Sequence, residues 1–155
     1  MECVFDVVDT EVLRQHSGLE FLRGIIDGRF PAPPISQLMG FWITRADPGE
    51  VVFETTPEFH HYNPIGTVHG GFMATLLDSC MACAVQTTLP VGQGYTSLEL
   101  KVNFVRPLTE ATGPVRAEGK VVHAGRRQGT AEGYLRDAKD KLYAHGTTTC
   151  MIFPL

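Results

Sequence analysis

The chain has 155 residues, enough for one domain whose folding buries roughly 70% of the unfolded surface at this size. Hydrophobic residues make up 43% and charged residues 19%, which excludes an intrinsically disordered chain, since disorder needs low hydrophobicity and high charge. The formal net charge of -4 is opposite to the basic excess of duplex-binding proteins, so nucleic acid is not an expected partner.

Neither a membrane nor a secretion route is indicated by the apolar segments. Asp, Gly or Pro interrupts them before they reach the ~18 residues of a membrane span. The first ten residues lack the basic start and long apolar stretch of a signal peptide, so we expect a cytoplasmic protein. The four cysteines are therefore expected to be reduced and mostly buried: Cys3, Cys80, Cys83 and Cys150.

The N-terminal part predicts a helix and a connection. Residues 10–27 carry apolar side chains at helical spacing and predict one helix, capped by Thr10 and ended by Gly28. The Phe-Pro-Ala-Pro-Pro segment that follows forbids regular structure. The chain is expected to divide into this helix with its connection, residues 1–33, and a main domain, residues 34–155.

The main domain predicts an α+β fold. Its elements are expected in this order: strands at 40–44 and 51–55, an irregular loop at 57–67, a helix at about 70–88, and strands at 96–104, 115–123, 130–136 and 142–152. Apolar and polar residues alternate from Thr96 to Phe104, which indicates a strand with one apolar face. Short turns between the late strands predict an antiparallel meander, and the long helix must pack against that sheet.

The predicted helix at 70–88 is apolar nearly all round, as expected of a helix buried on most sides. It carries one ionisable acid, Asp78. Burying a carboxylate without partners is costly, so Asp78 either accepts hydrogen bonds from a neighbouring element or lies in a cleft where it works. His69, Gly70 and Gly71 open the helix, and the free amides of a helix N-terminus can stabilise an anionic oxygen.

The spacing of these two features bears on oligomeric state. Gly70 and Asp78 are eight residues apart, which is ~12 Å along one helix. A reacting carbonyl needs contacts of ~3 Å to each group that acts on it. If both groups act on one substrate they come from two chains, which predicts a homodimer with two equivalent sites at its interface. The alternative is that only one of the two groups is functional.

Three motifs stand together between residues 63 and 107: NPIGTVHGG at 63–71, ATLLD at 74–78 and GYTSLELKVNFVRP at 94–107. Their joint occurrence resembles the hot-dog-fold acyl-CoA thioesterases of the PaaI type, a family associated with phenylacetate degradation. The resemblance covers about residues 34–153 and leaves the N-terminal helix mostly outside it.

The resemblance implies a hot-dog fold, in which an antiparallel sheet wraps around the long helix. It implies that two such units pair to give a continuous sheet, commonly in a dimer of dimers. Asp78 stands at the position of the catalytic carboxylate, which acts as general base or nucleophile. The Gly70 amide stands where the other subunit polarises the thioester carbonyl, and Asn63 where an amide helps to place the water or the carbonyl.

Five further residues are candidates for substrate binding. His69 is expected to fix the loop or cap the helix, with substrate contact as the alternative, and Gly71 shares that helix N-terminus. Ser97 matches a family position near the site, although strand alternation places it on the face away from the helix. Arg126 and Arg127, in a Gly-flanked hairpin, are either solvated or bind CoA phosphates.

The predicted function is hydrolysis of an aryl- or medium-chain acyl-CoA to free acid and CoA. The alternatives are a non-catalytic acyl-CoA-binding module, which serves as sensor or scaffold, and a dehydratase, which pairs a loop His with a helix acid in a different motif. Neither a cofactor nor a metal is expected. The Cys80–Cys83 and His60–His61 pairs lack a second set of ligands at a supporting spacing.

Overall fold

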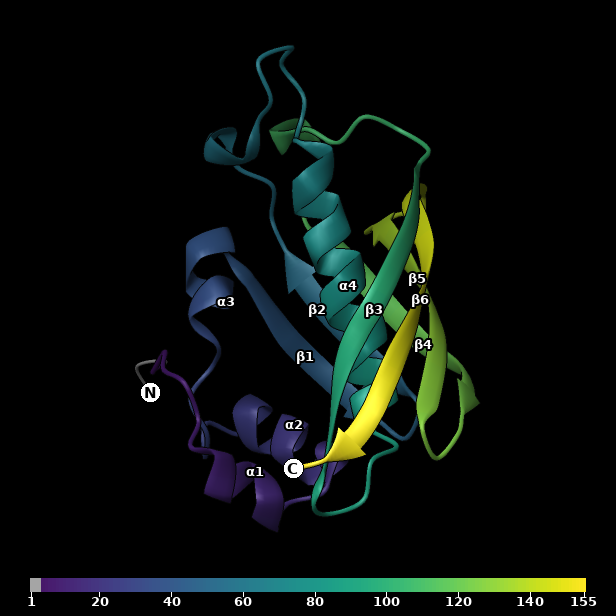
Figure 1. Cartoon of the computed structure of the whole chain (residues 1–155). Coiled ribbons are helices and arrows are strands. Elements are labelled where there is room, and N and C mark those ends of the chain that lie inside the picture. Colours follow the sequence, from purple (N-terminus) through teal and green to yellow (C-terminus); the bar gives the residue numbers. More distant parts are fainter. Residues whose placement is uncertain (1–3) are drawn as a thin grey trace.

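The computed structural model describes residues 4–155 (Figure 1). Three short helices come first: α1 (Thr10–Gln15), α2 (Gly18–Ile26) and α3 (Pro34–Met39). The main body follows, with β1 (Phe41–Asp47), β2 (Glu50–Thr55), α4 (Gly70–Gln86), β3 (Gln93–Phe104), β4 (Val115–Ala124), β5 (Gln128–Asp137) and β6 (Leu142–Pro154). Two single-turn 3-10 helices, η1 (Phe59–His61) and η2 (Glu110–Thr112), lie in the connections.

All six strands form one antiparallel sheet in the order β1-β2-β4-β5-β6-β3. Helix α4 contacts five of these strands and lies across one face of the sheet (Figure 1). The expected α+β fold, one long helix against an antiparallel sheet, is confirmed. The expectation of a meander holds for β4, β5 and β6 but is wrong for β3. This strand pairs with β6 at the sheet edge, because the connection over residues 105–114 carries the chain across to β2.

The single helix predicted over residues 10–27 is in fact two helices. The helical conformation is interrupted at His16, and Ser17 caps the N-terminus of α2 with a capping box. The Glu20 N–H donates to the Ser17 hydroxyl at 3.3 Å, and the Ser17 N–H donates to the Glu20 carboxylate at 2.9 Å. The capping residue of α1 is Asp9, one position before the predicted cap. Apolar spacing continues across the break, so periodicity alone cannot reveal it.

The proline-rich connection is also more regular than expected. Helix α3 begins at Pro34, since proline is well suited to the first helical position, where its missing N–H removes no helical hydrogen bond. Ala32 forms a parallel bridge with Phe5, which ties the N-terminal segment to the connection. Helix α2 packs on β1 through the buried Leu22. The N-terminal elements therefore cover a part of the sheet that α4 leaves open (Figure 1).

Three cysteines belong to the described residues and are free thiols, as expected. Cys80 and Cys150 are buried and Cys83 is half-buried, whereas Cys3 lies outside the described residues. Burial raises the pKa of the Cys83 thiol to about 12, so this thiol stays protonated near neutral pH. Within residues 4–155, no helix combines the length and apolarity that a membrane crossing demands.

Two glycines let α4 approach the sheet closely. Gly119 of β4 and Gly133 of β5 are cross-strand partners beneath the middle of the helix. A Cβ at Gly119 would overlap the Cys80 carbonyl oxygen, and one at Gly133 would lie 2.7 Å from Met81 Cγ. At Gly119 the backbone of α4, and at Gly133 its side chains, therefore occupy the space that a Cβ would need.

Replacing Gly119 tests this contact. We expect Gly119→Ala to lower the free energy of unfolding by about 1–3 kcal/mol, because the added methyl group must displace helix backbone. Urea denaturation measures the change. Val122→Ala on the same strand is the control, since Val122 is 65% exposed and its truncation should cost less than about 0.5 kcal/mol. Equal stability of Gly119→Ala and the native protein would contradict the close packing.

Candidate active site

Among residues 4–155, the acid of α4 has one hydrogen-bond partner, which lies on the edge strand β3. Asp78 is half-buried at the middle of the helix, and its Oδ1 accepts a hydrogen bond of 2.9 Å from the Ser97 hydroxyl of β3. The first interpretation left open by the sequence is therefore confirmed, because the carboxylate accepts a hydrogen bond from a neighbouring element, while part of its surface stays accessible. The pair bridges α4 and β3 and fixes where the carboxylate lies.

The strand face expected for Ser97 is wrong, and a β-bulge is the reason. The register of β3 against β6 shifts between Ser97 and Glu99, so Leu98 is an extra residue in the strand. Before the bulge, Tyr95 and Ser97 point toward α4, whereas after it Val102 packs on the core. Nothing in the sequence marks this bulge, because Leu98 fits the apolar alternation. Sequence reasoning therefore missed the Asp78–Ser97 contact.

The N-terminus of α4 is capped as expected. The Gly71 N–H donates to His69 Nδ1 at 2.8 Å, which occupies the Gly71 amide. Within residues 4–155, the Gly70 N–H has no hydrogen-bond acceptor, as is usual in the first turn of a helix. Gly70 lies against the Phe104 ring, since a Cβ there would be 3.1 Å from Phe104 Cζ. The Gly70 amide is therefore the donor of this turn that remains available to a ligand oxygen.

Asn63 lies in the loop before α4 and bonds within that loop. Its Oδ1 accepts from the Ile65 N–H at 3.0 Å and from the Thr67 N–H at 3.4 Å, and its Nδ2 donates to Thr67 Oγ1 at 2.9 Å. These are the bonds of a turn-forming asparagine. The side chain thus shapes the loop that leads to His69 and Gly70.

His61, which sequence reasoning did not select, anchors the same loop. Its buried ring stacks on Phe72 of α4 with centroids 4.0 Å apart, and its Nδ1 accepts from the Glu58 N–H at 2.9 Å. Its carbonyl oxygen accepts from the His69 N–H at 2.8 Å. Burial lowers the pKa of His61, so the ring is neutral at physiological pH. His61 therefore fixes the start of α4 twice, through its ring on Phe72 and through its carbonyl bond to the capping residue His69.

Arg126 and Arg127 form part of a groove of about 570 Å³ on the other side of the β3 bulge. Both are exposed in the β4–β5 hairpin, and the Ile152 N–H donates to the Arg127 carbonyl at 2.9 Å. Leu98, the bulged residue beside Ser97, lines the same groove. No acidic side chain occurs among its described lining residues. The groove therefore offers positive charge close to β3, the strand whose Ser97 hydroxyl donates to Asp78.

Gly70 and Asp78 are not brought together within one chain. Helix α4 is continuous from Gly70 to Gln86, so the eight residues between the two groups correspond to ~12 Å along its axis. One subunit thus presents an acid paired with a hydroxyl at one place and a free amide at another. Residues 4–155 contain no cluster of three or more His, Cys, Asp or Glu placed to hold a metal ion.

Comparison with known proteins places these elements in a family. The model of the thioesterase superfamily matches residues 65–144, which include Gly70, Asp78, Ser97 and both hairpin arginines. Human acyl-coenzyme A thioesterase 13 is 32% identical over 87 residues, 56% of this chain, and the match spans only 61% of the human protein. The proofreading thioesterase EntH of Klebsiella pneumoniae is 28% identical over 103 residues, 66% of this chain and 74% of EntH.

Solved structures agree with the sequence matches. A variant of the phenylacetic acid degradation protein PaaI from Thermus thermophilus superposes with a TM-score of 0.69 at 30% identity, covering 76% of this chain and 97% of that protein. The hot-dog fold and the PaaI-type resemblance expected from the motifs are thereby confirmed. The family model covers more than half of the 155 residues, and the chain belongs to the thioesterase superfamily.

Proposed function

We propose that this protein is an acyl-CoA thioesterase that cleaves aryl- or medium-chain acyl-CoA into the free acid and CoA. The observation that carries the proposal is Asp78, the one acid of an otherwise apolar helix, half-buried and oriented by the Ser97 hydroxyl. Partial burial of a carboxylate costs stability, and a protein that only binds acyl-CoA gains nothing from such a group beside a thioester. The names of thioesterase 13 and EntH support the same reaction class.

The proposed chemistry needs a carboxylate and an oxyanion donor. As a general base, Asp78 takes a proton from water while the water oxygen attacks the thioester carbon. As a nucleophile, its own oxygen attacks and water then cleaves the resulting anhydride. In both routes the carbonyl oxygen becomes negative and accepts a hydrogen bond from a Gly70 amide. The CoA sulfur leaves as a thiolate, which needs no strong general acid.

A second copy of the chain would supply that amide, and the edge strand supports such a pairing. Strand β3 has 12 residues with a free edge, and Leu98, Leu100 and Phe104 on it are 59%, 38% and 53% exposed. Long apolar edge strands are liable to associate unless they are paired. Two β3 strands running antiparallel would join two sheets into one, as expected from the resemblance.

The register of such a pairing supports a shared site. An antiparallel pair centred between Leu100 and Lys101 would set Ser97 of one chain opposite Phe104 of the partner subunit. Ser97 holds Asp78, and Phe104 lies against Gly70. The pairing would thus bring the acid of one chain toward the free amide of the other. Two equivalent sites follow from the twofold symmetry, and a further association of two dimers is compatible with them.

The CoA part of the substrate would lie in the groove of Arg126 and Arg127. Guanidinium groups suit phosphate binding because they donate paired hydrogen bonds and keep their charge. A local basic site is needed, since the net charge of -4 disfavours the approach of an anion such as CoA. Asn63 would act through the loop that presents Gly70, and His69 through the cap that leaves the Gly70 amide unoccupied.

The role of Asp78 can be tested by Asp78→Asn. We expect kcat for thiol release from aryl- or medium-chain acyl-CoA to fall by about 10²–10⁴-fold, because the base or nucleophile is lost. The asparagine oxygen can still accept from Ser97, so the fold should persist, and far-ultraviolet circular dichroism checks this. Ser79→Ala, on the same helix, is the control. Full activity in a folded Asp78→Asn protein would rule out the mechanism, and binding without turnover by the native protein would favour a sensor or scaffold.

The role of Ser97 is to position the carboxylate, and Ser97→Ala tests it. We expect kcat to fall by about 10–100-fold with little change in KM, because a hydrogen bond to a charged group contributes about 1.5–3 kcal/mol. Ser97→Thr should restore most of the activity, since it keeps the hydroxyl. Thr96→Ala, an exposed neighbour on β3, serves as the control. An unchanged kcat in Ser97→Ala would show that the hydroxyl does not orient the acid.

A further inference from the structure

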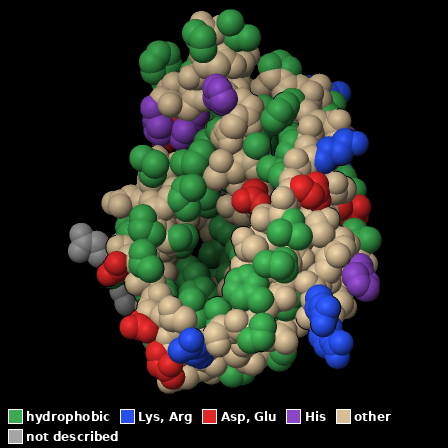
Figure 2. Space-filling model, viewed as in Figure 1, with side chains coloured by type: hydrophobic (Ala, Val, Ile, Leu, Met, Phe, Trp, Pro, Cys, Tyr) green, Lys and Arg blue, Asp and Glu red, His purple; other side chains and the backbone are tan. Residues whose placement is uncertain are grey.

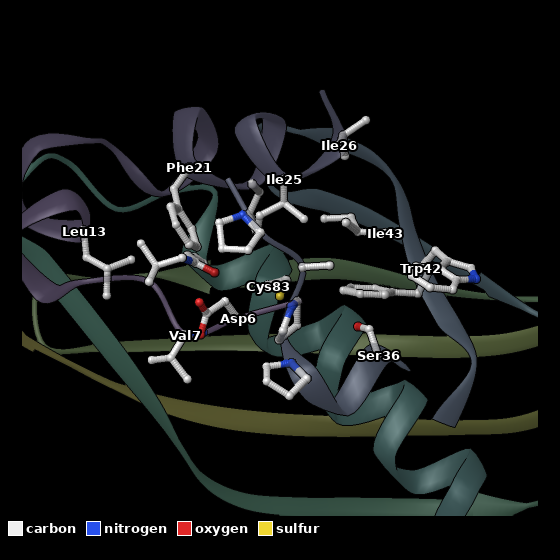
Figure 3. A pocket seen from close by; sticks show the side chains of 18 of the residues that line it. Asp6, Val7, Leu13, Phe21, Ile25, Ile26, Ser36, Trp42, Ile43 and Cys83 are labelled. Carbon is white, nitrogen blue, oxygen red and sulfur yellow. The ribbon is translucent and has the colours of Figure 1, made fainter. Parts of the chain in front are cut away.

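A second cavity, of about 580 Å³, lies between the N-terminal elements and the main body. Figure 2 shows a hollow in the surface whose walls are formed by hydrophobic side chains. Figure 3 shows Phe21 and Ile25 of α2, Trp42 and Ile43 of β1 and the segment around Val7 placed around Cys83 of α4. Much of this wall comes from residues before Pro34, which lie outside the region that matches the thioesterase superfamily.

This cavity reaches the two elements that hold the candidate catalytic pair. Cys83 of α4 and Tyr95 of β3 line it, and the Cys83 sulfur lies 3.9 Å from the Tyr95 hydroxyl. Cys83 is five residues from Asp78, about 7.5 Å along the helix, and Tyr95 is two residues before Ser97 on the same strand face. Burial raises the pKa of both groups, so both present neutral side chains to the cavity.

The lining of the cavity selects the chemistry of its occupant. No Lys or Arg occurs among the described lining residues, and the acid in the lining, Asp6, would repel a phosphate. The remaining polar contributions come from Ser36, Gln86 and Tyr95, against a wall of aliphatic and aromatic side chains. The volume of about 580 Å³ is several times the roughly 150 Å³ of a cavity that holds benzene. An aryl group would leave most of it unfilled.

We propose that the cavity between the N-terminal helices and α4 binds the aliphatic chain of a medium-chain acyl-CoA whose thioester lies at Asp78. The inference rests on the proposed function and narrows its substrate class, since it favours an alkyl chain over an aryl group. The segment before Pro34 is then a specificity element of this chain. Its side chains set how long an acyl chain fits beyond the Asp78–Ser97 pair.

Binding to the catalytically disabled protein tests the inference without any turnover. Trp42 is the only tryptophan of the chain and lines the cavity, so its fluorescence reports on occupancy. With Asp78→Asn protein, decanoyl-CoA should shift Trp42 emission, whereas butyryl-CoA, whose chain is too short to fill the cavity, should leave it unchanged. Hydrolysis by the native protein is measured separately. Absence of turnover there would contradict the proposed function, whereas the emission shift would still show whether the alkyl chain enters the cavity.

A narrowed cavity gives the second measurement. In the Asp78→Asn background, Val8→Phe should raise the Kd for decanoyl-CoA, measured by calorimetry. This fold-increase should be at least about ten times the fold-increase in the Kd for butyryl-CoA. Ile43→Phe narrows the cavity from β1 and provides a second variant should Val8→Phe fail to fold. Val4→Phe is the matched control, since Val4 is 66% exposed and outside the lining. An unchanged Trp42 emission with decanoyl-CoA, or an equal effect of both cavity variants on the two ligands, would overturn the inference.

Discussion

Burial of helix α4 is the constraint on which the rest of the structure depends. The helix is apolar nearly all round, so the sheet must wrap it, and glycines at Gly119 and Gly133 let its backbone come close. Such close packing leaves little freedom for the elements around the helix, because protein interiors are packed as densely as crystals of small molecules. Asp78, the one charge on this helix, is therefore held at a fixed depth and faces a fixed partner on β3.

The same constraint separates the parts of the candidate site. A straight helix keeps Asp78 and the Gly70 amide ~12 Å apart, and β3 contacts the helix at both places, since Ser97 lies beside the acid and Phe104 beside Gly70. One edge strand therefore contacts both groups of the candidate site, at two different positions along its length. An antiparallel partner strand would overlay the two halves, which is why we propose two chains for each site. The N-terminal helices, which cover what α4 leaves open, would then give the acyl chain its own cavity.

Most of the fold follows from periodicity, because the hydrophobic pattern of the strands and of α4 is set by burial. Two features did not follow from it. The helix interruption at His16 and the bulge at Leu98 both leave the apolar spacing intact, so the hydrophobic pattern gives no sign of either. The second one matters more, since it reverses the strand face and turns Ser97 toward Asp78. Sheet order was also beyond local reasoning, because it depends on where the connection over residues 105–114 crosses.

Complementation between two inactive variants tests the two-chain site most directly. Gly70→Pro removes the amide donor while suiting the first helical position, since His69 is already extended, and Gly70→Ala is the control that keeps the donor. Asp78→Asn and Gly70→Pro proteins are mixed, unfolded and refolded together, and thiol release from decanoyl-CoA is measured. Random pairing should restore about a quarter of native activity, because each mixed dimer holds one intact site. Activity no higher than that of the separate variants would contradict a site shared between chains.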